Sequence, residues 1–168
     1  MRLRPLTFPD WPAVHTFARL DEVCRYQPWG PNTPEQTRTY VREAAAAWQQ
    51  RPHTRYAYAV TADDTVIGTA DLHLRPDRQA EIGYLISPQH WGRGIATAAA
   101  RQLITTAFED HDIHRVYATC DPRNIGSARV LTKLGMRHEG RMRENMLIRD
   151  GWRDSDLYAV LHHEWTTR

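Results

Sequence analysis

The sequence predicts one mixed α/β domain, and three observations carry that prediction. Apolar and polar residues alternate in three strand-length runs along residues 55–86, which is typical of an antiparallel meander. An alanine-rich helical pattern over residues 95–108 separates the third run from another strand-like run at residues 114–120. A strand, a helix and a strand in this order favour a parallel crossover, so the sheet should contain both strand directions. The dipeptide Asp150-Gly151 predicts a hairpin that closes the fold.

The N-terminal part predicts a strand, a helix and a loop. Residues 2–7 alternate modestly between apolar and polar side chains and form the first expected strand. A helix should begin at Pro9 and Asp10, because the apolar residues after them recur on one helical face. Residues 24–34 are rich in proline and glycine, so we expect a loop there, and this loop carries Trp29.

A second helix has a clear start signal. Thr33 is a favoured N-cap residue, Pro34 suits the first helical position, and Gln36 completes a capping box. The helix should run to about Gln50. The strands of the meander that follows are expected at residues 55–62, 66–74 and 79–86, with tight turns between them.

The last part of the chain predicts one more helix and the hairpin. Residues 124–134 show helical spacing, and Gly135 follows them at the position where a helix often ends with a positive φ. Strands over residues 137–148 and 152–161 flank Asp150-Gly151.

Length and composition limit the class of protein. A chain of 168 residues suits one domain, and a hydrophobic content of 41% is enough for a core. No apolar run approaches the roughly 20 residues of a membrane span, and no secretory signal is visible, so we expect a cytoplasmic protein without a membrane partner. The formal net charge of +2, with acids and bases interleaved, argues against a nucleic-acid partner.

Cysteine and histidine usage points away from disulfides and metals. The two cysteines, Cys24 and Cys120, are too few for a disulfide framework. The nine histidines form no His-Glu-x-x-His pattern and have no acid-rich or cysteine-rich partners nearby in the sequence. The sequence therefore predicts no metal site.

Residues 89–96, with the sequence Gln-His-Trp-Gly-Arg-Gly-Ile-Ala, are the most informative stretch. Two glycines between a strand and a helix let the backbone turn tightly and approach a ligand. The N–H groups at the helix start then favour an anion, so the stretch has the chemistry of a pyrophosphate site. Because no Gly-Lys-Ser/Thr follows and a third glycine is missing, it is neither a Walker loop nor a dinucleotide fingerprint. Alone, it also fits a plain strand-to-helix turn.

This stretch resembles the Gln/Arg-x-x-Gly-x-Gly/Ala signature of the GNAT N-acetyltransferases, through Gln89, Gly92 and Gly94. Residues 80–88 resemble the fourth strand of that family, and residues 124–136 resemble its second conserved helix. The Asp-Gly-Trp hairpin, Asp156 and the closing Glu164-Trp165 are similar to the branch that contains RimJ and RimL, the ribosomal-protein N-terminal acetyltransferases. The resemblance extends over nearly the whole chain in the same order.

The resemblance implies a GNAT fold: a strongly twisted mixed sheet of six to seven strands with about four helices, splayed at a bulge in the fourth strand. Acetyl-CoA, the implied cosubstrate, would lie in the cleft, with its pyrophosphate on the backbone of the glycine-rich turn and its pantetheine arm along the fourth strand. The residues expected to bind it are Tyr84, Leu85, Ile86, Gln89, Gly92, Arg93, Gly94, Ile95, Ala96, Asn124 and Ser127.

Acyl transfer to an amine needs a group that removes a proton from the nitrogen. Glu81 is the candidate, because it precedes the expected bulge on a strand that borders the cleft. An ordinary surface carboxylate on an alternating strand is the alternative interpretation. If Glu81 is the base, Glu81→Gln should lower turnover and leave acyl-CoA binding intact.

The thiol end of the reaction is expected near the helix at residues 124–134. Many enzymes of this type have a tyrosine acid seven residues after Asn124, where this chain has Leu131. Ser127 is the polar residue left in that region, and the RimJ/RimL-like branch has a serine near the CoA sulfur. Asn124 and Ser127 also suit helix capping, so both interpretations stay open.

The acceptor site is less defined by the sequence. Trp29, Arg143 and Glu81 are the candidates for its wall. The alternative interpretation is that Trp29 is a buried structural residue and that Arg143 belongs to an ordinary surface ion pair. The acceptor amine is either a protein N-terminus or a small molecule. A larger donor such as succinyl-CoA and a non-catalytic CoA-binding regulatory module remain alternatives. The chain is expected to be a monomer or a homodimer.

Overall fold

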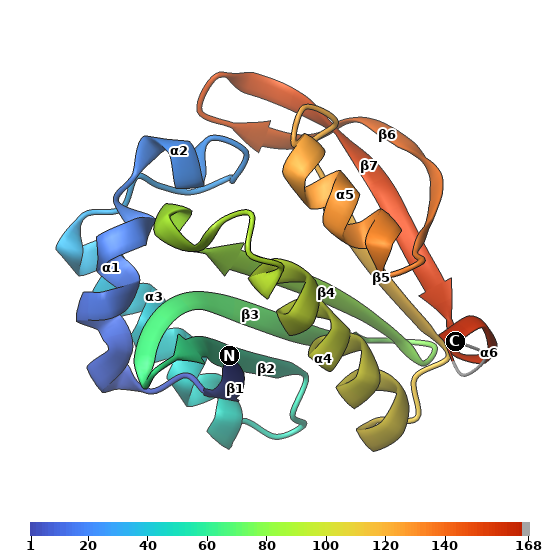
Figure 1. Ribbon diagram of the computed structural model, residues 1–168, viewed down its shortest axis with the longest axis horizontal. Coiled ribbons are helices and arrows are strands. Elements are labelled where there is room, and N and C mark those ends of the chain that lie inside the picture. The colour runs from blue at the N-terminus through green and yellow to red at the C-terminus, as the bar shows by residue number, and fades with distance from the viewer. Residues whose placement is uncertain (166–168) are drawn as a thin grey trace.

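One sheet of seven strands runs through the computed structural model, in the spatial order β1-β2-β3-β4-β5-β7-β6 (Figure 1). The structure describes residues 1–165. Strands β4 and β5 pair in parallel and every other neighbouring pair in this sheet is antiparallel, which confirms the predicted mixed sheet. The strands are β1 Arg2–Pro5, β2 Arg55–Ala62, β3 Thr65–Arg75, β4 Gln79–Ile86, β5 Arg115–Cys120, β6 Arg137–Ile148 and β7 Gly151–Leu161.

Helices cover both faces of the sheet (Figure 1). None of the helices within residues 1–165 is long and apolar enough to span a bilayer. The short helices α2 and α6 were not predicted, since four residues are too few to show a helical period. The helices are α1 Trp11–Ala18, α2 Asp21–Cys24, α3 Pro34–Ala46, α4 Ile95–Asp110, α5 Ile125–Lys133 and α6 His162–Trp165.

The start of α3 confirms the capping box. The Thr33 hydroxyl accepts a hydrogen bond from the Gln36 N–H at 3.3 Å, and the Gln36 side-chain oxygen accepts one from the Thr33 N–H at 2.8 Å. A 3-10 turn, Ala47–Gln49, extends the helix to Gln50 as predicted. This stretch buries its apolar side against β2 and β3, together with α1.

Two hydrophobic cores lie on opposite faces of the sheet. The larger core packs α4 and α5 against the central strands, and Leu72, Leu103 and Leu131 are among its fully buried side chains. The smaller core packs α1 and α3 against the other face and includes Phe17 and Val41. The two faces are called here the α4/α5 face and the α3 face. Each residue of the central strands therefore belongs to one face or the other.

The C-terminal hairpin is confirmed, but its turn lies one residue earlier than predicted. Ile148 pairs with Gly151, so the two turn residues are Arg149 and Asp150. Gly151 begins β7 with a φ of +120°, a value that few other residues adopt. Strand β6 is irregular farther from the turn, because residues 143–145 lie opposite one residue of β7.

The central feature of the sheet is the separation of β4 from β5. Their parallel pairing joins Gln79, Ala80 and Glu81 to residues 115–117 and stops there. The remaining part of β4, residues 82–86, keeps β3 on one side, and within residues 1–165 no strand pairs with it on the other. The predicted splay is thus confirmed. The expected bulge is not found, because β4 pairs with β3 in one unbroken register from Gln79 to Ile86.

Two glycines on neighbouring strands should respond differently to alanine. A Cβ on Gly68 would lie 2.3 Å from the carbonyl oxygen of Leu85, whereas a Cβ on Gly83 would meet nothing within 4 Å. We expect Gly68→Ala to lower the free energy of unfolding by about 1–3 kcal/mol through overpacking. Gly83→Ala, the matched control, should stay near the wild-type value. Urea denaturation measures both, and equal losses would contradict this account of the β3–β4 contact.

Candidate active site

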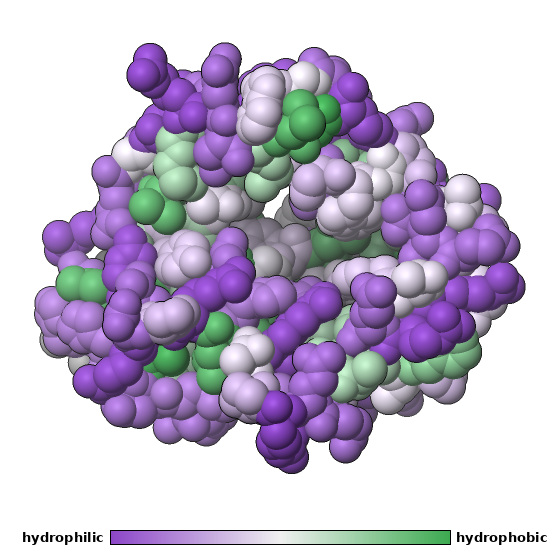
Figure 2. All heavy atoms as spheres, turned by 180° about the vertical axis from the view of Figure 1, so that it is seen from behind, coloured by the Kyte–Doolittle hydropathy of each residue, from purple (hydrophilic) through white to green (hydrophobic). Residues whose placement is uncertain are grey.

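A cavity of about 1100 Å³ opens where β4 leaves β5. Its walls come from the end of β4, the turn before α4, the start of α5, the loop after α2 and the strands of the C-terminal hairpin. Viewed from behind, the molecule is deeply hollowed near its centre (Figure 2). Segments that are far apart in the sequence therefore meet around one space.

The cavity connects the two faces of the sheet. Along β4, Ile82, Tyr84 and Ile86 pack on the α4/α5 face, whereas Leu85 packs on the α3 face. Because side chains alternate along a strand, Glu81 and Gly83 share the face of Leu85. Residues from both sets line the cavity. A ligand that passes between β4 and β5 can thus contact polar groups on either side of the sheet.

The turn before α4 has the predicted form. Gly92 and Gly94 adopt positive φ angles of +72° and +75°, and a Cβ on either would meet nothing within 4 Å. The N–H of Ala98 donates the first helical hydrogen bond, to Gly94 O at 3.0 Å, so the N–H groups before it have no intrahelical acceptor. The indole N–H of Trp91 holds the turn to the end of β4, through Ile86 O at 2.7 Å. Uncovered N–H groups at a helix start suit an anion.

Three further residues beside this turn were missed by sequence reasoning. His90 lines the cavity, and its Nδ1 is buried without a partner among the described residues. Arg129 and Lys133, one helical turn apart on α5, also line the cavity. A basic pair on a helix is an ordinary surface pattern, so the sequence carried no signal for it. Gln89 and Arg93, which were predicted here, have exposed side chains and lie outside the lining.

Tyr84 and Ser127 meet on the α4/α5 face of the cavity. The Tyr84 hydroxyl lies 3.0 Å from the Ser127 hydroxyl. Burial raises the pKa of Tyr84, so the phenol stays protonated and able to donate. Burial also raises the pKa of the neighbouring Cys120 thiol to about 11, which keeps it a neutral thiol at neutral pH. This pair places two hydroxyl groups at the split in the sheet.

The side chain of Asn124 caps the start of α5. Its side-chain oxygen accepts a hydrogen bond from the Ser127 N–H at 3.1 Å, so Asn124 is the N-cap of α5. The Ser127 hydroxyl faces Tyr84 instead of a helix N–H. Both residues line the cavity. Leu131, which stands where many related enzymes have a tyrosine acid, is fully buried in the core.

Glu81 lines the cavity on the α3 face, with its carboxylate already engaged. The Arg75 guanidinium donates to Glu81 Oε2 at 2.6 Å, and the Tyr117 hydroxyl donates to the same oxygen at 3.4 Å. His73, the partner of Glu81 across the β3–β4 pair, lines the same part of the cavity. His73 was not predicted, because a single histidine in an alternating strand resembles any half-buried residue.

The loop after α2 forms another wall of the cavity. Trp29 lines it as predicted and is 37% exposed. The guanidinium of Arg149, in the hairpin turn, donates to Gly30 O and, at 3.2 Å, to Cys24 O. The loop is therefore tied to the C-terminal hairpin. Arg143 is exposed and lies outside the lining, so the structure does not bring it to this site; it belongs to the irregular part of β6.

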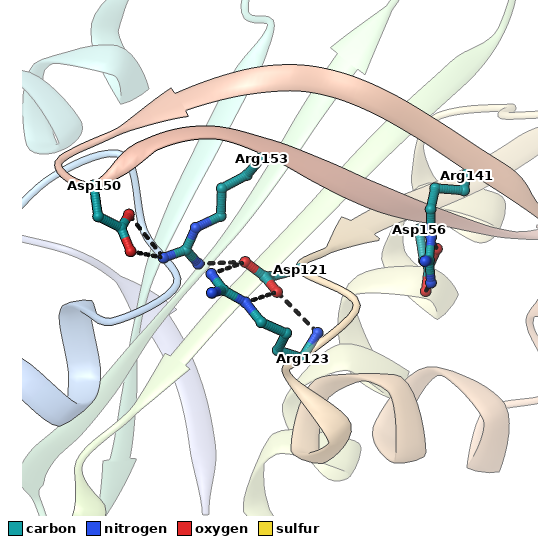
Figure 3. A network of polar contacts seen from close by, with 6 residues as sticks. All are labelled: Asp121, Arg123, Arg141, Asp150, Arg153 and Asp156. Atoms are coloured by element: carbon teal, nitrogen blue, oxygen red, sulfur yellow. Dashed lines mark hydrogen bonds and ion pairs between the residues drawn. The ribbon is translucent and has the colours of Figure 1, made fainter.

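A buried polar network supports the far side of the cavity (Figure 3). Asp121, at the end of β5, accepts hydrogen bonds from Arg123 and from Arg153 of β7. The side chains of Asp121 and Arg153 are only 4% and 9% exposed. Arg153 also binds Asp150 in the hairpin turn, at 3.0 and 3.1 Å. The network thus joins β5, the start of α5 and the hairpin.

A second pair, Arg141 and Asp156, lies farther along the sheet (Figure 3). It links the two strands of the hairpin, β6 and β7, at 2.8 and 3.1 Å. Within the described part of the chain, no three His, Cys, Asp or Glu side chains are grouped closely enough to hold a metal ion.

Comparison with known proteins gives first the class of enzyme and then the family. The Bacillus subtilis protein named "Uncharacterized N-acetyltransferase YnaD" is 30% identical over 164 residues, which are 97% of this chain and 94% of that protein. Residues 1–137 match the family model described as the Acetyltransferase (GNAT) domain. The chain therefore belongs to the GNAT family of acetyltransferases, as its motifs indicated.

Two other similar proteins bear on the fold and on the acceptor. The Escherichia coli K12 protein named Spermidine N(1)-acetyltransferase is 26% identical over 98% of this chain and 88% of its own length. The solved structure described as Mycobacterium smegmatis RimJ in complex with CoA-disulfide has a TM-score of 0.84 and 23% identity, over 98% of this chain and 87% of that chain. The similarity to this solved structure confirms the fold.

Asp121 should be important for stability. Burial by itself would raise the pKa of Asp121, but hydrogen bonds from Arg123 and Arg153 lower it below its ordinary value. A lowered pKa stabilises the fold above the unfolded-state pKa near ~3.9, and this contribution is lost as the pH falls through the folded-state pKa. Asp121→Asn should cost about 3 kcal/mol at pH 7, because it removes the buried carboxylate and leaves the buried Arg153 guanidinium with the exposed Asp150 as its remaining carboxylate partner among residues 1–165. The difference from wild type should shrink in strong acid.

Urea unfolding at pH 7 and at acidic pH measures this effect. Asp112→Asn is the matched control, since Asp112 pairs with Arg78 on the surface and its side chain is 86% exposed. An exposed pair contributes about 1 kcal/mol or less. Equal losses in the two variants would contradict the role given to Asp121.

Proposed function

We propose that the protein transfers the acetyl group of acetyl-CoA to a primary amine, by direct attack in a ternary complex. One observation carries the proposal: the free N–H groups at the start of α4, the unpaired edge of β4 and the Tyr84–Ser127 pair all face one cavity. These groups suit, in turn, a pyrophosphate, an extended amide-bearing chain and a thiol. Membership of the GNAT family supports acetyl-CoA as the donor.

The donor side uses mainly backbone groups. Arg93, Gly94, Ile95 and Ala96 supply N–H groups at the positive end of α4 for the pyrophosphate. Among the strands that the structure describes, none pairs with residues 84–86 of β4 on the side of β5, so an extended pantetheine arm can add to this edge as a strand would. Arg129 and Lys133 supply positive charge from α5. Glycine at positions 92 and 94 keeps side chains away from the bound phosphates.

The thiol side uses Tyr84 and Ser127. As the acetyl group leaves, sulfur takes the electron pair of the C–S bond and becomes a thiolate. A protonated phenol beside a serine hydroxyl can stabilise that charge and supply a proton. The non-catalytic alternative rested on Leu131, where a tyrosine acid is absent. Tyr84 supports the catalytic proposal, because it brings a phenol to this region from the strand instead of the helix.

The acceptor enters from the α3 face in this proposal. The cavity lining contains Trp29 and three carboxylate residues: Glu81 on this face, Glu22 of α2 and Asp154 of β7. Carboxylates beside an aromatic ring favour a cationic amine. The name of the spermidine relative supports a small polyamine-like acceptor, and the RimJ/RimL-like motifs support a protein N-terminus.

Thiol release from acetyl-CoA tests the proposed function. The purified protein would be supplied with two acceptor pools: peptides of varied N-terminal residue, and small amines that include polyamines and aminoglycosides. Turnover with either pool supports the proposal and identifies the acceptor class. Tight binding of acetyl-CoA with no thiol release in either pool would favour the regulatory module, unless succinyl-CoA then supports release.

Tyr84→Phe should separate catalysis from binding. Removal of a proton donor to the leaving thiolate should lower kcat by about 100-fold, while the Kd for acetyl-CoA changes little. Ser127→Ala should lower kcat as well. Tyr58→Phe is the matched control, because Tyr58 lies in β2 outside the cavity lining. Steady-state kinetics and acetyl-CoA titration provide the two readouts. Full turnover and full affinity in both variants would remove the pair from the mechanism.

A further inference from the structure

Four polar side chains form one row across the α3 face of the sheet. Arg55 of β2 pairs with His73 of β3, His73 pairs with Glu81 of β4, and Glu81 pairs with Tyr117 of β5. Direct cross-strand partners project to the same face, so their side chains are neighbours. The pair of Glu81 and Tyr117 is the last one before β4 and β5 separate. The row therefore borders the opening between the strands.

Gly83 leaves free space next to this row. It follows Glu81 on the same face of β4 and pairs with Asp71 on β3. A Cβ at Gly83 would meet nothing within 4 Å, although the residue lines the cavity. The absence of a side chain creates room beside His73 and Glu81, in front of the opening. An amine placed there would be next to both residues.

His73 and Glu81 differ in what their side chains already contact. Glu81 holds a close ion pair with Arg75 and accepts a hydrogen bond from Tyr117, both through Oε2, so this oxygen of its carboxylate is occupied. The His73 ring lies 3.8 Å from a carboxylate oxygen of Asp71, but it has no hydrogen bond to any of the described residues. Asp71 itself is bound by Arg55 at 2.8 Å. The imidazole thus keeps both ring nitrogens available for hydrogen bonds, whereas Glu81 is held by a positive charge at Oε2.

We propose that His73, rather than Glu81, accepts the proton that the acceptor nitrogen loses, and that Glu81 positions the amine beside it. This inference rests on the proposed acetyl transfer. It deepens that proposal by assigning the proton acceptor to a residue that the sequence motifs do not contain.

The proton balance of the step is complete. The nitrogen lone pair attacks the thioester carbonyl carbon and forms the N–C bond. The C–S bond breaks, and its electron pair leaves on sulfur. The proton lost by nitrogen goes to the His73 imidazole and then to water. On the other face of the sheet, the Tyr84 hydroxyl gives its proton to the thiolate and regains one from water, so one proton leaves nitrogen and one reaches sulfur. No oxidant, reductant or metal is needed.

The surroundings of His73 keep its ring neutral at pH 7. Burial lowers the pKa of His73 below 6.5, and the positive charges of Arg55 and Arg75 lower it further. The carboxylates of Asp71 and Glu81 oppose this shift without reversing it. A neutral imidazole can accept a proton, so turnover should rise with pH through the lowered pKa and then level off.

The pH dependence of kcat tests the assignment, with saturating acetyl-CoA and an acceptor that the wild-type protein uses. We expect His73→Gln to lower kcat by about 100-fold and to remove the acidic limb below pH 6.5. Glu81→Gln should mainly raise the KM for the amine and keep that limb. His114→Gln is the matched control, because His114 is exposed and lies outside the cavity lining. Adding imidazole to His73→Ala should restore turnover in proportion to its concentration.

The outcomes separate this inference from the proposed function. A wild-type protein that binds acetyl-CoA but acetylates no amine would refute the function, and this inference with it. An active wild type, together with a His73→Gln variant of unchanged kcat and pH profile, would overturn only the role of His73. Loss of the acidic limb in Glu81→Gln instead would transfer the role to Glu81. The acetyl-CoA affinity of each variant shows whether the variant is folded.

Discussion

The parallel pairing of β4 with β5 is the constraint on which the rest of the structure depends. It extends over three residue pairs and then stops. A longer ladder would close the cavity, and a shorter one would leave the C-terminal strands unattached to β4. The part of β4 without a β5 partner keeps its strand conformation because it pairs with β3 along its full length and packs against the larger core. The same split gives access to both faces of the sheet, so in the proposed reaction the thiol and the amine would lie on opposite sides of one strand.

Much of the fold follows from local patterns. The capping box at Thr33, the meander and the crossover helix each have a signal that a short window of sequence contains. The point where β4 and β5 stop pairing has no such local signal, because the alternation of side chains in β4 continues unchanged past Glu81. The resemblance to a known family predicted the splay of β4 from β5. It also predicted a bulge in β4, which is absent from the β3–β4 pairing. The turn at Arg149 and Asp150 shows a related limit, since a favoured dipeptide marks a turn without fixing its register.

The candidate site was predicted best where chemistry depends on the backbone. Gly92 and Gly94 adopt the expected conformation, and Ser127 lies at the cavity with Tyr84. Residues that gain significance only from distant neighbours were missed. The position of His73 suggests a role only once three strands align it with Glu81 and Tyr117. Asp121 likewise stands out only because Arg153 of β7 contacts it. Arg143 lies outside the cavity lining, in the part of β6 where two extra residues interrupt the alternation of side chains.

The open space at Gly83 has a consequence for how such an enzyme diverges. Most positions around a catalytic centre are packed, so a new side chain there changes specificity and stability together. Gly83 lines the cavity, and apart from its two chain neighbours no atom of the described residues lies within 4 Å of an added Cβ. If the acceptor amine binds beside Gly83 as proposed, mutations at this codon can alter which amines fit without being removed by selection for folding. This single glycine on β4 would then let acceptor preference change while the scaffold is conserved.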